Sequence, residues 1–210
     1  AYGTHKLLMP VGVALGLWIL LSALIDPIDR LRRGLSLPAG VLGMAIAHAG
    51  LGLTTLGITV VQSATLEVDR AVAAGESVAL GGYSFRFEGV KPVEGPNYEA
   101  IEGRVVVSKA GKDVVALLPQ KRTYWVQQNP MTEAAISARW DRDLFVAMGE
   151  DVGRGAWSLR LQVRPLIQFV WWGALIMMLG GIVSGLDRRY RLPKEAAVPA
   201  ADAAQSGASA

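Results

Sequence analysis

Hydrophobic residues gather in three long runs, and polar and apolar residues alternate in the long segment between the second run and the third. The runs cover residues 7–25, 40–62 and 166–186. The middle one, from Val41 to Val61, reads VLGMAIAHAGLGLTTLGITVV and carries no charge. About twenty consecutive apolar residues form a helix long enough to cross a hydrocarbon core of ~30 Å. The pattern therefore predicts a helical membrane protein with three transmembrane helices.

The arginines predict which helix ends face the cytoplasm. One cluster (Arg30, Arg32 and Arg33) lies in the connection 26–38, and a second (Arg188, Arg189 and Arg191) ends the segment 165–191. Cytoplasmic loops carry an excess of Arg and Lys. The chain is therefore expected to begin outside, cross inward, return, and cross inward again after the long middle segment. Residues 192–210, rich in Ala with Pro, Ser and Gly, predict a disordered cytoplasmic tail.

The middle segment, residues 63–164, has the pattern of β-strands. In YSFRFEGV, which starts at Tyr83, aromatic and polar residues alternate, so every second side chain faces the same way. Similar runs are IEGRVVVS, DVVALL, RTYWVQ, DLFVAMG and WSLRLQV, with turn residues between them. We expect an inserted all-β extracytoplasmic domain, a small antiparallel barrel or sandwich. The run MTEAAISARW is expected to be a helical turn or a loop.

Composition supports a membrane protein and removes several classes of function. Hydrophobic residues make up 51% of the chain, and the mean hydropathy is +0.32. A net charge of only +3 gives no nucleic-acid footprint, and the absence of cysteine excludes disulfides, thiol nucleophiles and Cys-based metal sites. Residue 1 is Ala, and no signal sequence precedes the first run, so we expect a piece of a longer protein.

His48 is the residue whose chemistry stands out within the predicted spans. Lipid offers no hydrogen-bond partner, so an imidazole near mid-depth must face other protein or a ligand. Ala45 and Gly52, three and four residues away, predict room beside the ring for a bulky group. A neighbouring face favours close helix contact through small residues: Gly43, Ala47, Gly50, Thr54 and Gly57. Two interpretations stay open: a structural histidine hydrogen-bonded to another helix, or a ligand of a buried cofactor.

Other polar residues give weaker signals. The sequence has no HExxH, no GxSxG and no phosphate-binding loop, and no spacing of its carboxylates selects a catalytic pair. Lys121 and Arg122 predict either an anion-binding patch or, more simply, a solvated strand face. His5 precedes the first apolar run and is expected at the solvated membrane edge.

Several segments together resemble the C-terminal third of the cytochrome c-type biogenesis family CcmF. They are GGYSFRFEGV, GPNYEAIEG, LLPQKRTYWV, MTEAAI, RDLFVAMGE and AWSLRLQVRPLIQFVWWGALIMMLGGIVSGLDRRYR, together with AHAG around His48. The similarity extends from about Leu7 to Arg191. This family is the large membrane subunit of the bacterial haem lyase. The resemblance therefore implies a multi-pass protein of the cytoplasmic (inner) membrane with its β-domain in the periplasm.

The resemblance also implies a site and partners. The family's late transmembrane histidine is one axial ligand of a b-type haem within the helix bundle, and His48 matches it. The second ligand and the tryptophan-rich WWD segment belong to earlier helices that this chain lacks; Trp171-Trp172 is not that segment, because Gly173 follows it. Implied partners are those helices, the haem chaperone CcmE, a CcmH-type subunit and apocytochrome c. No residue here is assigned a catalytic role, and the chain alone is not expected to be active.

Two other classes of function stay open on the sequence. One is a non-catalytic scaffold, in which three helices anchor a β-domain that recruits periplasmic partners and His48 merely packs. The other is a transporter fragment in which His48 relays protons. A transporter of that kind has ionisable residues on several spans, whereas the predicted spans here offer only His48, which argues against it.

Overall fold

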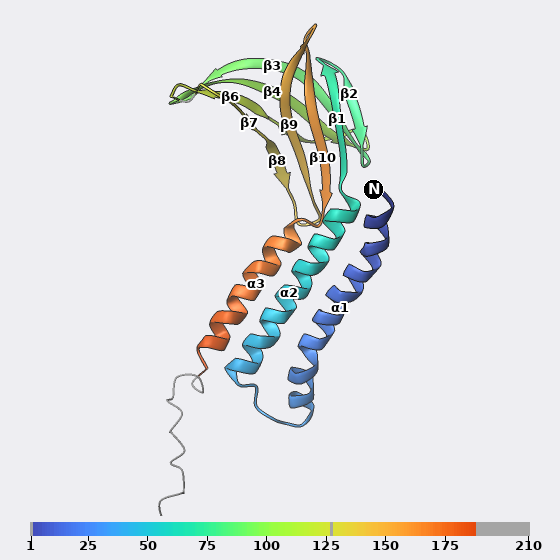
Figure 1. Cartoon of the computed structure of the whole chain (residues 1–210), viewed down its shortest axis with the longest axis vertical. Helices are drawn as coiled ribbons and strands as arrows, with labels where there is room; N and C mark the ends of the chain where they lie inside the picture. The colour runs from blue at the N-terminus through green and yellow to red at the C-terminus, as the bar shows by residue number, and fades with distance from the viewer. Residues whose placement is uncertain (1, 127, 188–210) are drawn as a thin grey trace, which may run out of the picture.

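The computed structural model describes residues 2–126 and 128–187, with side chains from Leu8 onward, as a row of helices below a β-domain (Figure 1). Helix α1 spans Tyr2–Arg32, α2 spans Ala39–Ala64 and α3 spans Gln168–Gly185. Within the described part, each is long and apolar enough to cross a membrane, α1 from Leu8 onward. The chain is thus a helical membrane protein with an inserted β-domain, as predicted.

Helix α2 lies between α1 and α3 and packs against both (Figure 1). Its contact with α3 uses the predicted stripe of small residues. A Cβ atom on Gly50 would lie 2.6 Å from the carbonyl oxygen of Gly173, and one on Gly43 would lie 2.3 Å from the backbone nitrogen of Ser184. Backbones this close leave no room for a side chain, and such contacts hold helices together in lipid, where hydrophobic burial contributes little.

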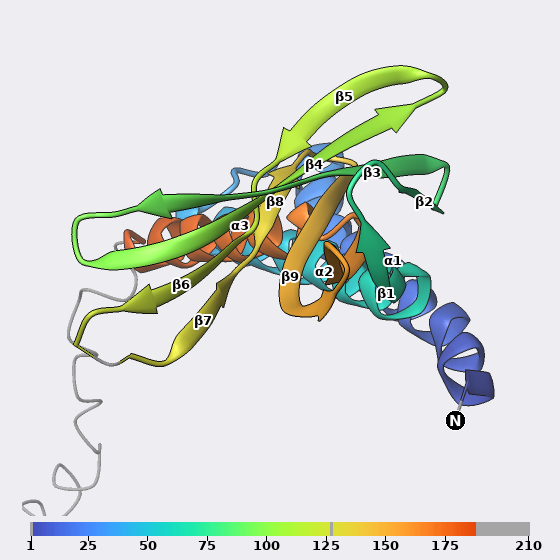
Figure 2. The ribbon, with the colours of Figure 1, turned by 90° about the horizontal axis from the view of Figure 1, so that it is seen from above.

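The β-domain consists of two antiparallel sheets. One has the strand order β1-β10-β9-β8, and the other has the order β2-β3-β4-β6-β7, with β5 also paired to β4. Seen from above, β9 runs at a steep angle to β3 and β4 (Figure 2). The strands are β1 Leu66–Ala73, β2 Ser77–Leu80, β3 Tyr83–Glu94, β4 Tyr98–Lys109, β5 Lys112–Leu117, β6 Gln120–Tyr124, β7 Pro130–Glu133, β8 Ala135–Ala138, β9 Arg142–Gly153 and β10 Ala156–Pro165.

The alternation in β3 and its partner strands defines the core of the sandwich. Tyr83, Phe85 and Phe87 are 7%, 1% and 0% exposed. Burial of a large apolar side chain contributes about 1.5–3 kcal/mol, so this stripe is a main source of the domain's stability. The core also receives Val105 and Val107 from β4, the neighbouring strand of the same sheet, and from β9 and β10 of the facing sheet it receives Leu144, Val146, Met148, Leu159 and Leu161. On the outer face of β3, Glu88 pairs with Arg86 at 3.0 Å and with Arg104 at 2.8 Å.

The sandwich is joined to the helices by short connections. Only Thr65 separates α2 from β1, which pairs along its length with β10, and β10 leads through Leu166 and Ile167 into α3. The backbone N–H of Leu166 donates to the carbonyl oxygen of Asp141 (3.0 Å). The side-chain amide of Gln168 donates to the carboxylate of Asp143 (3.0 Å). The turn between β8 and β9 is therefore fixed to the start of α3.

The first helix extends further than the sequence predicts. A loop is expected over residues 26–38, but α1 continues through Arg32. Asp26 pairs with Arg30 and Asp29 with Arg33, each at 3.1 Å and each four residues apart. Pairs at this spacing stabilise a helix by roughly 0.2–0.5 kcal/mol. The charges that indicated a loop therefore belong to a solvated last turn of the helix.

The segment MTEAAISARW is also corrected by the structure. It forms strands rather than a helical turn or loop: β7 pairs with β6, and β8 pairs with β9. Both are short, and short strands at a sheet edge carry little periodicity to predict them. The basic stop at 188–191 and the tail 192–210 lie outside the described residues, as does the side chain of His5.

Candidate functional site

His48 lies on a face of α2 that α1 and α3 leave open. Its side chain is exposed, whereas α3 covers the glycine stripe on another face of the same helix. His48 comes nine residues after Ala39, where α2 begins, which corresponds to a rise of ~14 Å. This is close to half of a hydrocarbon core of ~30 Å. The imidazole is therefore near mid-depth on a surface available to a further group.

A hydrogen bond fixes the orientation of the ring. His48 Nδ1 lies 2.8 Å from the carbonyl oxygen of Met44, one turn earlier in α2. Because a carbonyl oxygen only accepts, Nδ1 carries the proton and donates it. The lone pair of Nε2 is then available to a ligand, which is the arrangement that metal-bound histidines use.

The structure corrects the predicted space beside the ring. Ala45 and Gly52 are both buried, and Gly52 faces α1. A Cβ atom on Gly52 would lie 2.7 Å from Cγ of Leu20 and 3.0 Å from the carbonyl oxygen of Gly16. A bulky group near His48 must therefore occupy the open face of α2, because α1 fills the gap at Gly52.

The open face, here called the His48 face, is marked by further polar side chains. At helical spacing from His48 it continues through Leu51, Thr55, Ile58 and Gln62. Sequence reasoning missed Thr55 and Gln62, although their distances from His48, seven and fourteen residues, were a usable signal. The opposite face of α2 has only apolar residues: Leu42, Ala49, Leu53 and Val60. The polar groups therefore favour the His48 face as the functional one.

A groove lies at the outer end of the His48 face. It measures about 290 Å³ and is formed by α1 and α2 together, lined by Leu8, Ile58, Thr59, Gln62 and Ser63. Thr59 and Ser63 donate their hydroxyl protons to carbonyl oxygens one turn earlier, at 2.7 Å each. The groove thus presents Gln62 and apolar side chains at the end of the helices nearest the sandwich.

Lys121 and Arg122 do not form an open anion-binding patch. Lys121 forms an ion pair with Glu150 of β9. The guanidinium of Arg122 lies 4.5 Å from the ring centre of Tyr98 and 3.8 Å from the carboxylate of Glu133. Its pKa is raised, chiefly by a hydrogen bond with Tyr124. Both cations have partners within the sandwich, and their side chains are only 13% and 27% exposed, so they form neither an open anion-binding patch nor a fully solvated strand face.

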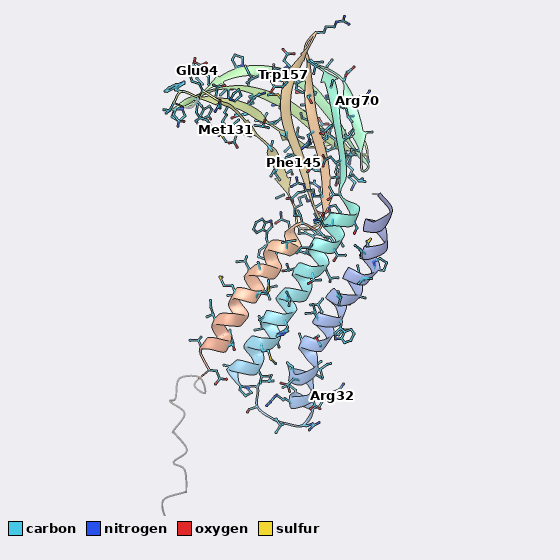
Figure 3. The ribbon with its side chains drawn as sticks, in the orientation of Figure 1. Arg32, Arg70, Glu94, Met131, Phe145 and Trp157 are labelled. Carbon is cyan, nitrogen blue, oxygen red and sulfur yellow. The ribbon has the colours of Figure 1, made fainter. Side chains whose placement is uncertain are left out.

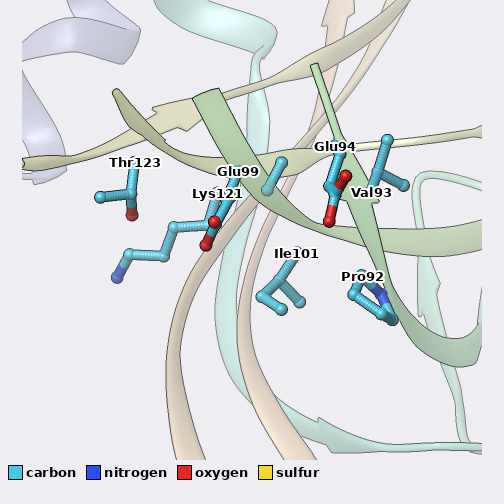
Figure 4. A pocket seen from close by; sticks show the side chains of 8 residues that line it. Pro92, Val93, Glu94, Glu99, Ile101, Lys121 and Thr123 are labelled. Carbon is cyan, nitrogen blue, oxygen red and sulfur yellow. The ribbon is translucent and has the colours of Figure 1, made fainter. Parts of the chain in front are cut away.

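A hollow beside Lys121 lies between β3, β4 and β6 (Figure 4). It measures about 280 Å³ and is lined by Pro92, Val93, Glu94, Glu99, Ala100, Ile101, Lys121 and Thr123. Ligand pockets usually measure ~300–1,000 Å³ and converge on a few polar groups. This hollow is smaller and open, and its cation already has a carboxylate partner, so we do not treat it as the main site.

The described residues can supply a single axial ligand to a haem iron, but they do not form a complete metal site. Among these residues, no three His, Asp or Glu side chains gather to hold an ion. A haem iron, by contrast, takes four ligands from its porphyrin and needs only single side chains from the protein. One oriented imidazole on an open helix face, that of His48, meets that need.

Comparisons with known proteins support this direction. The family model described as the CcmF C-terminal β-sandwich matches residues 63–165, the whole of the domain described above. The chain is 41% identical over 198 residues to the cytochrome c-type biogenesis protein CcmF of Pseudomonas fluorescens, covering 91% of this chain and 30% of that protein. It is 38% identical over 181 residues to CcmF of Escherichia coli (strain K12), covering 86% and 28%.

A solved structure has the same fold. It is named cytochrome c heme lyase CcmF and superposes with a TM-score of 0.70 at 18% identity, over 86% of this chain and 33% of that one. The chain thus spans about 30% of the length of the curated relatives that it matches. Its β-sandwich and its flanking helices agree with these proteins both in sequence and in fold. The chain belongs to the CcmF family of cytochrome c-type biogenesis proteins and corresponds to their C-terminal part.

Proposed function

We propose that this chain contributes to the haem lyase of cytochrome c maturation, where His48 supplies one axial ligand of a transmembrane b-type haem. The rest of a CcmF protein supplies the other axial ligand from its earlier helices. The β-domain lies in the periplasm and takes part in haem transfer from the chaperone and in thioether attachment to apocytochrome c. The observation that carries the proposal is the oriented imidazole of His48 on the open face of α2.

Three features of the chain support the ligand role. The Met44 carbonyl holds the ring and directs the lone pair of Nε2 outward. The open face places that lone pair near mid-depth, where an uncompensated imidazole is costly. Among the described residues the hydrogen bond of His48 stays within its own helix, so the ring makes no polar contact with α1 or α3. When bound, a haem supplies an iron centre that exchanges one electron.

The arrangement of charges supports a periplasmic position for the β-domain. Arg32 ends α1 at the side of the helices remote from the sandwich (Figure 3). Together with Arg30 and Arg33 it forms a basic cluster, and such clusters stay on the cytoplasmic side of the inner membrane. The opposite ends of the helices, and the sandwich joined to them, then face the periplasm. There the domain meets the partners expected for the family: the chaperone CcmE, a CcmH-type subunit and apocytochrome c.

The ligand role is tested in the complete protein by replacing His48. In purified, correctly folded protein, His48→Ala should abolish the absorption bands of the b-type haem. Imidazole added to His48→Gly should restore them, because the free base can enter the space left by the side chain. The matched control is Leu53→Ala, on the opposite face of the same helix, which should keep the bands. Unchanged bands in His48→Ala would remove this residue from the ligand set.

The same variants separate the haem lyase from a scaffold. A scaffold needs only the sandwich and its anchor, so partner binding and the haem spectrum should both survive in His48→Ala. Loss of the spectrum with retained partner binding supports the haem role and separates it from a failure of folding.

A further inference from the structure

One exposed tryptophan of the β-domain, Trp140, lies in a turn beside the start of α3. Trp140 occupies the turn between β8 and β9 and is 69% exposed. In Figure 1 this turn lies at the lower end of the sandwich, directly above the start of α3. The neighbouring residue Asp141 accepts a hydrogen bond from the backbone N–H of Leu166, two residues before α3 begins (3.0 Å).

The length of α3 fixes the depth of this turn. The helix has 18 residues, Gln168–Gly185, and rises by ~27 Å. A hydrocarbon core is ~30 Å thick, so α3 needs its full length to cross, and any tilt shortens its reach further. Gln168 must therefore lie at the boundary of the core. The headgroup layer above it is ~5–7 Å thick on each side. Because the turn is bonded to Leu166, it lies within this layer.

The turn is held rigidly, so Trp140 stays in place. Arg139 and Arg142 exchange backbone hydrogen bonds (2.9 and 3.2 Å). Arg142 is 5% exposed, and its guanidinium donates to the hydroxyl of Tyr83 (3.1 Å) and to the carbonyl of Ser137 (3.0 Å). These contacts fix the turn to both sheets of the sandwich. Only the exposed side chains of Arg139 and Trp140 in this turn can still change conformation.

We propose that the β8–β9 turn is a membrane-surface contact, in which the indole of Trp140 lies among phospholipid headgroups. Trp171 and Trp172, three and four residues into α3, are 64% and 55% exposed and lie ~4–6 Å deeper, at the edge of the hydrocarbon core. Indoles favour this layer because one end is apolar and the other donates a hydrogen bond. The guanidinium of Arg139 lies 3.7 Å from the carboxylate of Asp141 and remains 56% exposed, which suits it to a phosphate group. The contact orients the sandwich on the bilayer.

The absence of cysteine from the sequence makes a direct test possible. Trp140→Cys gives a unique position for a nitroxide label, and Trp125→Cys is the matched control, since Trp125 is 58% exposed at the end of β6. Each labelled chain is placed in nanodiscs of phosphatidylcholine and phosphatidylglycerol. Collision rates with oxygen, which enters the bilayer, and with a water-soluble nickel chelate then report the surroundings of the label.

At position 140 the ratio of oxygen to nickel collisions should exceed that at position 125 several-fold. Equal ratios at both positions would overturn the proposal, because the turn would then lie in water. A label at 140 that is immobilised and shielded from both reagents would also overturn it, since protein rather than lipid would then cover the turn.

A second measurement keeps Trp140 intact. The chain is produced with 5-fluorotryptophan, and the signal of Trp140 is assigned by its disappearance in Trp140→Phe. A lipid with a spin label on its headgroup should broaden the Trp140 signal strongly and the Trp125 signal weakly. Equal weak broadening of both signals would contradict the proposal even if the cysteine variants misfolded.

Discussion

The backbone N–H of Gly40, in the first turn of α2, donates a 2.6 Å hydrogen bond to the carboxylate of Asp187, which follows the end of α3. Asp187 is 8% exposed. Residue Pro38 precedes α2 and gives it no side-chain cap, so the exposed N–H groups of its first turn depend on a carboxylate from another helix. A negative charge at this end also complements the helix dipole. The contact therefore joins α2 to α3 at the end remote from the sandwich.

Removing this carboxylate should weaken the pairing of α2 with α3. We expect Asp187→Ala to lower the free energy of unfolding by about 1–2 kcal/mol, the usual cost of a lost helix cap. Unfolding of the chain in mixed micelles with rising sodium dodecyl sulfate measures the loss. Asp29→Ala is the control: its pair with Arg33 is exposed, and its removal should cost at most about 0.5 kcal/mol. Equal effects of the two variants would contradict the capping role.

Two glycine substitutions should have opposite effects on the helices. Gly50→Ala places a methyl group 2.6 Å from the carbonyl oxygen of Gly173, so α2 and α3 must move apart. We expect a loss of about 1–3 kcal/mol, as for other overpacked contacts. Gly181→Ala, on α3, meets no atom within 4 Å and should stabilise the helix by up to about 1 kcal/mol. The midpoints of detergent unfolding give both values, and a tolerated Gly50→Ala would exclude the close packing.

Tyr83→Phe should destabilise the end of the sandwich nearest the helices. The hydroxyl of Tyr83 accepts a hydrogen bond from Nε of the buried Arg142, so its loss leaves a buried cation without that acceptor. The expected cost is about 1–3 kcal/mol. Tyr98→Phe is the control, because it keeps the ring on which Arg122 lies. Faster hydrogen exchange in β3 and β9 of Tyr83→Phe alone is the expected result.

The sandwich should lose stability in acid. The pKa of Glu102 is held below its ordinary value of 4.5, chiefly by the hydrogen bond from the Gln120 amide (2.6 Å) and then by Lys91. Arg86 and Arg104 lower the pKa of Glu88 in the same way, and Arg160 lowers that of Asp69. A lowered pKa in the folded state means that the stabilisation is complete above the unfolded value and is lost as the pH falls through the folded one.

The melting temperature of the β-domain should therefore fall between about pH 5 and pH 3. Glu102→Gln keeps an acceptor for Gln120 but cannot be protonated. The melting temperature of this variant should therefore fall less than that of the wild type over the same pH interval. A wild-type melting temperature that is constant down to pH 3 would contradict the role of these carboxylates.

Much of the architecture follows from local patterns. The run from Val41 to Val61 has no charge and is long enough as a helix to cross the hydrocarbon core, where a helix satisfies its own backbone hydrogen bonds. The alternation of Tyr83, Phe85 and Phe87 with polar residues likewise requires a strand with one buried face. The boundaries were less predictable. The charged residues Asp26 and Asp29 predicted a loop. In the structure they form ion pairs one turn apart, and the helix continues past them.

The candidate site was predictable in its residue but not in its surroundings. His48 stood out because an imidazole is rare within a span. Its neighbours Ala45 and Gly52 suggested free space, yet both are buried and Leu20 of α1 fills the space at Gly52. The spacing of small residues indicates that a face packs closely, without indicating which helix covers it. That depends on the positions of α1 and α3.

The sequence by itself determined three membrane-spanning helices, an inserted β-domain and a histidine near mid-depth, because hydrophobic period and span length are properties of neighbouring residues. Only the tertiary structure decided that His48 remains on an open face, that Trp140 lies beside the start of α3, and that Asp187 caps a helix 147 residues earlier in the chain. These relationships join segments far apart in sequence. They depend on how helices and sheets pack against one another, which no local pattern encodes.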